Sequence, residues 1–159
     1  MIIMGVDIGI AITGIGVIEK SGYKTQYISH TVIETHKDLS VPDRLAIIHK
    51  KFLELIDTFK PEIIAVEELF FFKNAKTIIN VAQARGVVLL TIQELGLRFE
   101  EYTPLQVKQG ISSYGRADKG QVQRMVKMVL NLSEIPKPDD AADALAIAWC
   151  CSNSISLKQ

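Results

Sequence analysis

Apolar residues along the chain alternate between the two-residue period of strands and the longer period of helices. Residues 2–6 and 62–66 are short apolar runs of the kind found in buried strands. Residues 13–19 and 24–33 are rich in β-branched and aromatic side chains and flank a short turn, which predicts a hairpin. Residues 98–102 predict a fifth strand.

Between and after these strands, apolar residues recur at helical spacing. Pro42 opens one helix, and Asp118 is placed to cap another. Three antiparallel strands followed by alternating helices and strands predict a layered α/β domain, with a five-stranded mixed sheet flanked by helices. We expect one domain over residues 1–152 and a polar tail at 153–159. The helices are expected at 42–60, 74–95, from residue 104 to a loop at 110–115, 118–130 and 139–152.

The composition fits a globular domain and gives no sign of targeting. The chain has 159 residues, and its 48% hydrophobic content allows a sizeable core. The first 18 residues are apolar, but they carry Asp7 and four glycines and lack a basic start, which favours strands over a signal or membrane segment. We therefore expect a cytoplasmic protein with no membrane partner. Cys150 and Cys151 are expected to be buried free thiols.

Charge is unevenly distributed along the chain, although its formal net charge is zero. Residues 71–92 contain three basic residues and no acid, and residues 105–130 contain five basic residues against Asp118 alone. A neutral total can therefore hide a basic face of the kind that binds nucleic acid. Ordinary solvated helix charges remain the alternative for part of this set.

Four carboxylates are candidates for one site. Asp7 and Glu67 end the first and fourth expected strands, and α/β folds place ligands at the carboxyl ends of strands. Asp140 and Asp143 lie three residues apart near the start of a helix, so they share one face. Taken singly, Asp7 could be a turn residue and Asp140 a helix-capping acid. Strand alternation alone leaves open whether Glu67 or its neighbour Glu68 faces the site.

The last helix explains why these acids would bind metal. Its sequence from residue 141 to 151, AADALAIAWCC, is apolar nearly all round, which indicates a buried helix. A carboxylate at Asp143 must then be protonated, paired or metal-bound, and that helix contains no Lys or Arg. Clustered carboxylates without His or Cys favour magnesium or manganese. Two such ions can support phosphodiester hydrolysis without a protein nucleophile.

The chain resembles the RuvC family of bacterial Holliday-junction resolvases. The matching segments run in the family's order and span nearly the whole chain. They are VDIGIAITGIGVIE (6–19), AVEELFFFKNAKT (65–77), AQARG (82–86), YTPLQVKQG (102–110), GRADKGQVQRMV (115–126) and PDDAADALAIA (138–148). The chain departs from the family in one turn, where Ile8 replaces a common proline, although Gly9 still allows a sharp bend.

This resemblance implies a ribonuclease-H-like fold and a function. A homodimer would nick two opposing strands of a four-way DNA junction symmetrically and leave 5′-phosphate and 3′-hydroxyl ends. It also implies Mg²⁺ dependence, with two ions per site in the DNA complex and Mn²⁺ as a substitute. A branch-migration complex of RuvA and RuvB would be a partner. The family pattern selects Asp7, Glu67, Asp140 and Asp143 as the catalytic and metal-binding acids.

Further residues are expected to contact DNA or a second subunit. Exposed aromatics beside lysines suit unstacked bases, and the family match selects Phe70, with core burial as the alternative for the phenylalanines. The helix at 74–95 is too apolar around its circumference to pack on one sheet alone, so we expect it at the dimer interface; packing on the protein's own helices is the alternative. The expected DNA contacts are Phe70, Lys73, Asn74, Lys76, Lys108, Tyr114, Arg116 and Lys119, and the expected interface residues are Ile78, Ala82, Arg85 and Leu89.

Two other activities share parts of this pattern. A catalytically inactive junction-binding module would keep the fold without turnover, but all four acids are present. A related nuclease that acts on ribosomal RNA precursors has the same fold and acids, but the AQARG and DAADALA segments point away from it. An actin-like ATPase also begins with a DxGxxxTG turn, yet it would need a second such motif and a much longer chain.

Overall fold

A mixed sheet lies at the centre of the computed structural model. Within residues 1–69, 75–112 and 117–156, which the structure describes, the sheet has five strands in the order β3-β2-β1-β4-β5. β1, β4 and β5 are parallel, and β2 and β3 form the predicted antiparallel hairpin beside β1. The five predicted strands are confirmed. Their bounds are β1 Ile2–Asp7, β2 Ile12–Ser21, β3 Lys24–Glu34, β4 Ile63–Glu67 and β5 Arg98–Tyr102.

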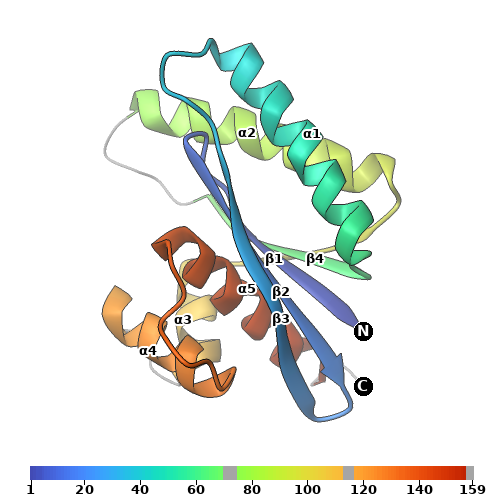
Figure 1. Cartoon of the computed structure of the whole chain (residues 1–159), viewed down its shortest axis with the longest axis vertical. Coiled ribbons are helices and arrows are strands. Elements are labelled where there is room, and N and C mark those ends of the chain that lie inside the picture. Colours follow the sequence, from blue (N-terminus) through green and yellow to red (C-terminus); the bar gives the residue numbers. More distant parts are fainter. Residues whose placement is uncertain (70–74, 113–116, 157–159) are drawn as a thin grey trace.

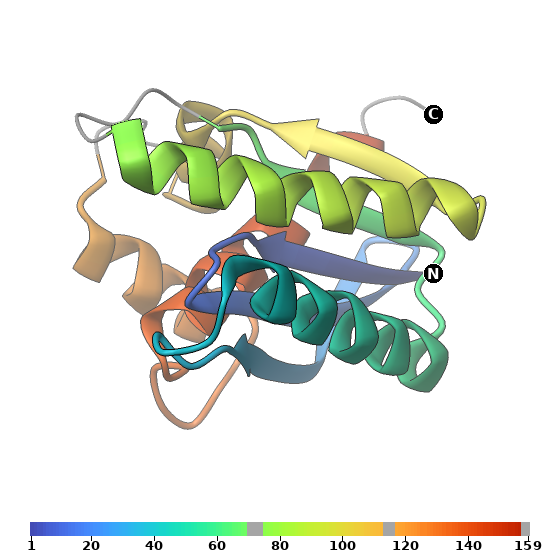
Figure 2. The same cartoon turned by 90° about the horizontal axis from the view of Figure 1, so that it is seen from above.

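Helices cover both faces of this sheet (Figure 1). α1 and α2 lie together on one face, and α3, α4 and α5 lie on the other, as the view from above also shows (Figure 2). Asp118 caps α4 as predicted, because its side chain accepts from the Gln121 N–H while the Gln121 side chain accepts from the Asp118 N–H. The helices are α1 Val41–Phe59, α2 Ala75–Glu94, α3 Pro104–Ser112, α4 Lys119–Val129 and α5 Asp139–Ser156.

Each face of the sheet has its own hydrophobic core. On the α1 and α2 side, Phe52 and Val88 pack with Met4, Val6 and Val66 from the strands. On the opposite side, α5 and the inner faces of α3 and α4 pack on the alternate strand residues, which include Ile3 and Ala65. Side chains alternate across a strand, so each strand serves both cores.

Glycines allow α5 to lie directly on the sheet. A Cβ at Gly14 would sit 1.9 Å from the Asp140 carbonyl oxygen, and one at Gly5 would sit 2.0 Å from that of Ala144. Real Cβ atoms do not approach backbone atoms so closely, so a residue with a side chain would push α5 outward at either position. These glycines therefore set the height of α5, and with it the position of its acids, above β1 and β2.

Two helix ends differ by more than one residue from the sequence-based expectation. α3 continues to Ser112, three residues into the expected loop, because Ile111 is buried in the core and Gly110 packs against Cys150. α5 continues to Ser156, four residues past the expected end, and Ile155 is buried there. Cys150 and Cys151 are free and buried, as predicted. Among the described residues, no helix is long and apolar enough to cross a membrane.

Candidate active site

Asp7 and Glu67 are the last residues of the adjacent parallel strands β1 and β4. Val6 and Val66 pair in register and both point into the core beneath α1 and α2. The next residue along each strand therefore faces the opposite side, towards α5. This alternation resolves the choice that the sequence left open, because it directs Glu67 into the α5 side.

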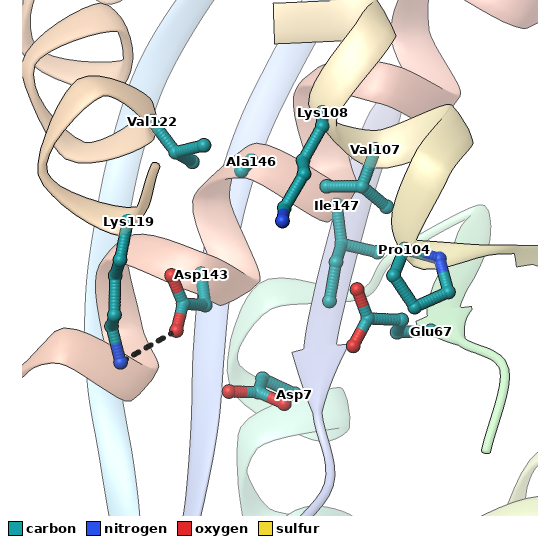
Figure 3. Close-up of a pocket in the computed structure, with 10 residues that line it drawn as sticks. All are labelled: Asp7, Glu67, Pro104, Val107, Lys108, Lys119, Val122, Asp143, Ala146 and Ile147. Carbon is teal, nitrogen blue, oxygen red and sulfur yellow. Dashed lines mark ion pairs between the residues drawn. The ribbon is translucent and has the colours of Figure 1, made fainter. Parts of the chain in front are cut away.

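A pocket of about 260 Å³ opens where these strand ends meet α3, α4 and α5. Asp7, Glu67 and Asp143 point into it, and Lys108 and Lys119 reach it from α3 and α4 (Figure 3). Charged groups from two strand ends and three helices thus converge on one hollow. Its remaining walls are Pro104, Val107, Val122, Ala146 and Ile147.

Asp143 is paired with a lysine from a different helix. Lys119 Nζ lies 3.2 Å from Asp143 Oδ2 and 3.3 Å from Asp139 Oδ2. The Asp143 side chain is 31% exposed, so it lies at the pocket wall and is not fully buried. The sequence identified the need for a counter-charge, but α5 itself carries no Lys or Arg; the cation comes from the first turn of α4.

The carboxylates resist ionisation because they are buried together. Burial, followed by repulsion from Asp143, Glu67 and Asp140, raises the pKa of Asp7 from 3.8 to about 7, although Lys119 opposes the shift. Burial and Asp143 likewise raise the pKa of Glu67, against the effect of Lys108. Burial also raises the pKa of Asp143. Asp140 does not line the pocket, but it is near enough to act on Asp7.

The chemistry of this cluster fits a hard divalent cation. Its donors are all carboxylate oxygens, and their mutual repulsion is what a bound divalent ion relieves. Within the described residues, however, no three His, Cys, Asp or Glu side chains are placed to hold one ion together. In this arrangement of side chains, the protein's own Lys119 therefore serves as the counter-charge to Asp143.

Side-chain hydrogen bonds hold the turn that follows Asp7. Thr13 Oγ1 donates to the Gly9 carbonyl oxygen at 2.6 Å, and Thr35 Oγ1 donates to the Ile10 carbonyl oxygen. Arg44 Nε in turn donates to Thr35 Oγ1 at 2.8 Å. The chain with Ile8 thus uses two threonines and an arginine to fix the bend that follows the first acid.

Metal-free protein should lose stability as the pH rises. A carboxyl whose pKa is higher in the folded state binds more protons folded than unfolded, so the free energy of unfolding falls with rising pH between the two pKa values. For Asp7 this window runs from about 4 to about 7, and Glu67 and Asp143 act in the same direction. With EDTA present, we expect Tm to fall by about 2–4 °C for each kcal/mol lost across this window.

Calorimetry of the wild type and Asp7→Asn at pH 5, 6, 7 and 8 measures this slope. The amide cannot titrate, so the variant should show a shallower decline. An equally steep decline in both proteins would show that Asp7 does not titrate in this window.

The remaining predicted DNA contacts are described only in part. Phe70, Lys73, Asn74, Tyr114 and Arg116 lie outside the described residues, and of Lys76 only the backbone, at the start of α2, is described. Lys108 and Lys119 do line the pocket. The sequence analysis did not predict the hydrophobic residues that line the pocket. Two of them, Pro104 and Val107, lie in the segment YTPLQVKQG, which carries part of the family resemblance.

The outer face of α2 differs in part from the predicted interface set. Ala82 is exposed, whereas Ile78 and Leu89 are half-buried. Arg85 binds within its own chain, to Glu67 and Glu101. Among its described side chains, α2 presents Ile79, Ala82, Gln83, Gly86, Leu90, Gln93 and Glu94 outward.

Relatives of known name match the chain over nearly its whole length. A protein from Thermosipho melanesiensis is 55% identical over 150 residues, which cover 94% of this chain and 96% of the relative. One from Halothermothrix orenii is 55% identical over 159 residues, covering 100% of this chain and 96% of the relative. Both are named crossover junction endodeoxyribonuclease RuvC.

Solved structures give the same fold. Thermus thermophilus RuvC in complex with a Holliday junction substrate is 36% identical, with a TM-score of 0.93 over 99% of this chain and 96% of that one. The yeast mitochondrial Holliday junction resolvase Ydc2, at 16% identity, has a TM-score of 0.71 over 98% of this chain and 80% of that one, a likeness of fold alone. The family model for crossover junction endodeoxyribonuclease RuvC matches residues 3–151. The chain therefore belongs to the RuvC family of crossover junction endodeoxyribonucleases, nucleases that depend on a divalent metal.

Proposed function

We propose that this protein resolves four-way DNA junctions in recombination and repair by nicking two opposing strands symmetrically. The observation that carries the proposal is the convergence of Asp7, Glu67 and Asp143 with Lys108 and Lys119 in one pocket. Acids and lysines together suit phosphodiester hydrolysis, since the acids hold cations and the lysines bind phosphate. The products would carry 5′-phosphate and 3′-hydroxyl ends.

The pocket residues have distinct roles in this proposal. Asp7, Glu67, Asp140 and Asp143 would hold Mg²⁺, two ions in the DNA complex, with Mn²⁺ able to substitute. A metal bound there would supply an activated water and would stabilise the leaving oxygen. Lys108 and Lys119 lie beside the acids at the pocket wall and would bind the scissile phosphate. When DNA enters, phosphate oxygens offer Lys119 an alternative partner to Asp143.

Phe70 is the aromatic that we propose to contact unstacked bases at the junction. Lys73, Asn74, Lys76, Tyr114 and Arg116 are proposed as backbone contacts. Along the chain, they follow the strand end of Glu67 or precede the start of α4. We also propose that the protein works in the cytoplasm with a RuvA–RuvB branch-migration complex, as the family resemblance implies.

A synthetic four-way junction tests the substrate class. The protein is incubated in Mg²⁺ with this junction, a matched linear duplex and a branched RNA, and the products are mapped on both strands. We expect paired nicks at symmetric positions on the junction, with ends that DNA ligase seals. Binding of the junction without cutting in any divalent metal would instead favour an inactive junction-binding module. Cutting of the branched RNA alone would favour the ribosomal-RNA nuclease.

The outer face of α2 is our proposed dimer interface. Ile79 and Leu90 are 57% and 58% exposed, and Ala82 and Gly86 lie between them on the same stripe. Among the described residues, and apart from the backbone of α2 itself and the two chain neighbours of Gly86, no atom lies within 4 Å of a Cβ placed at Gly86, so a second helix can approach closely there. Symmetric nicking also needs two active sites related by a two-fold axis, which an isologous dimer supplies.

Leu90→Lys should convert the dimer to a monomer. A lysine within this apolar interface would be desolvated without a partner, which costs several kcal/mol. Sedimentation equilibrium at micromolar concentration measures the change. Met128→Lys is the matched control, because Met128 is 69% exposed on α4 and away from this stripe. A Leu90→Lys protein that remains dimeric would exclude this face as the interface.

A further inference from the structure

Arg85 lies on α2 but its side chain turns back towards the strands. It is 12% exposed, and its two terminal nitrogens have different partners. Nη1 donates to the backbone carbonyl oxygen of Glu67 at 2.9 Å, and Nη2 forms an ion pair with the Glu101 carboxylate. A charge so enclosed must be paired, and both partners that satisfy it belong to the carboxyl ends of strands.

The two partners lie on neighbouring strands at the edge where the pocket opens. Glu67 ends β4, and Glu101 is the penultimate residue of β5. The next N–H, that of Glu68, donates to the Tyr102 carbonyl oxygen at 2.8 Å and closes the parallel pair. Arg85 therefore holds β4 at the point where the chain leaves the sheet. It binds the carbonyl group of Glu67, the residue whose side chain enters the pocket.

We infer that Arg85 is a positioning residue for Glu67, with Glu101 as its anchor; this rests on the proposed function of the pocket. A planar guanidinium holds two acceptors in fixed directions, so it can fix the Glu67 peptide relative to β5. The orientation of that peptide determines where the Glu67 side chain projects.

This role differs from a contact with DNA or with a second subunit. Both bonds of the guanidinium are made within the chain, and the outward stripe of α2 is formed by other residues, among them Ala82 and Gly86. Arg85 instead ties the helix that carries the proposed interface to an acid of the proposed active site. Through Arg85, the segment AQARG would thus affect catalysis by fixing the position of Glu67, although Arg85 does not line the pocket.

The test separates binding from cutting in dimeric protein. Single-turnover cleavage rates on a four-way junction are measured for the wild type, Arg85→Ala, Arg85→Lys and Glu101→Gln, with junction Kd measured in EDTA and dimerisation by sedimentation. We expect Arg85→Ala to cut about 10²-fold more slowly, the loss typical of a misplaced catalytic group, with unchanged Kd and dimerisation. Arg85→Lys keeps the charge but loses the two-pronged geometry, so its rate should lie between these values. Glu101→Gln retains an oxygen acceptor and should lose least.

Arg98→Ala is the matched control. Arg98 also pairs with a glutamate of β5, Glu100 at 2.7 Å, but it lies at the opposite end of that strand from Glu101. The Arg98→Ala protein should therefore cut at the wild-type rate. Suppose that the wild type cuts the junction. If Arg85→Ala or Glu101→Gln then binds the junction or dimerises more weakly in proportion to its loss of cleavage rate, the positioning role is wrong. The same holds if all variants cut at the wild-type rate. If Arg85→Ala fails to fold, Arg85→Lys and Glu101→Gln decide by the same criteria. A wild type that does not cut the junction would overturn the proposed function itself.

Discussion

Asp7→Asn should lower junction cleavage by on the order of 10³-fold or more, as expected when a strong electrostatic contact is removed from a reaction centre. The amide keeps the shape of the side chain but cannot carry the negative charge that a divalent metal requires. Asp7 is the acid with the raised pKa of about 7, and three other carboxylates act on it, so it is the electrostatic centre of the cluster. Cleavage time courses in saturating Mg²⁺ measure the rate.

Binding of the junction should survive the same change. Removing a negative charge beside incoming phosphates cannot weaken their attraction, so the Kd in EDTA should be unchanged or lower. Glu68→Gln serves as the control, because Glu68 neighbours Glu67 in sequence but does not line the pocket. Metal-dependent nicking by Asp7→Asn within tenfold of the wild type would remove Asp7 from the catalytic site.

Gly14→Ala should reduce both stability and cleavage. The added Cβ would meet the Asp140 carbonyl oxygen at 1.9 Å, so α5 must shift away from β2. Overpacking of this kind costs about 1–3 kcal/mol in the free energy of unfolding. The shift also carries Asp140 and Asp143 away from Asp7, and a displacement near 1 Å can cost about 10²-fold in rate. Urea unfolding and single-turnover cleavage measure the two effects.

A destabilised control is needed to separate these effects. Ile155→Ala removes a buried side chain at the far end of α5 and should cost about 2–5 kcal/mol without moving the acids. Well below the Tm of both variants, Ile155→Ala should cut at the wild-type rate. If the two variants lose activity in proportion to stability alone, Gly14 has no role in placing the acids.

Much of the fold could be predicted because each element carries a local signal. The hairpin between β2 and β3, the cap at Asp118 and the apolar runs of β1 and β4 are all legible within about ten residues. The end of α5 could not be predicted locally, since residues 153–156 are polar apart from Ile155, which packs on the core. Tertiary packing determines such helix ends, and local propensity does not.

The candidate site was predictable in its acids and less so in their surroundings. Strand ends and helix spacing predicted that Asp7, Asp140 and Asp143 lie near Glu67 or Glu68, and the family resemblance selected Glu67. The pocket brings Asp7, Glu67 and Asp143 together, whereas Asp140 does not line it. The pairing of Lys119 with Asp143 depends on the packing of α4 against α5, which no spacing in the sequence encodes. The inward turn of Arg85 depends likewise on the distance between α2 and the strand ends.

The glycines beneath α5 also limit what the enzyme can do when it meets DNA. A helix backbone that rests on strand backbone has no space in which to settle, and close-packed interiors resist compression. The acids of α5 are therefore presented on a stiff support. If a phosphate does not fit the position of the acids, the nucleic acid must change its shape, because the helix cannot move. Nucleic acid bends most easily where base stacking is already interrupted. Preference for branched DNA would follow from this stiffness as well as from direct contacts.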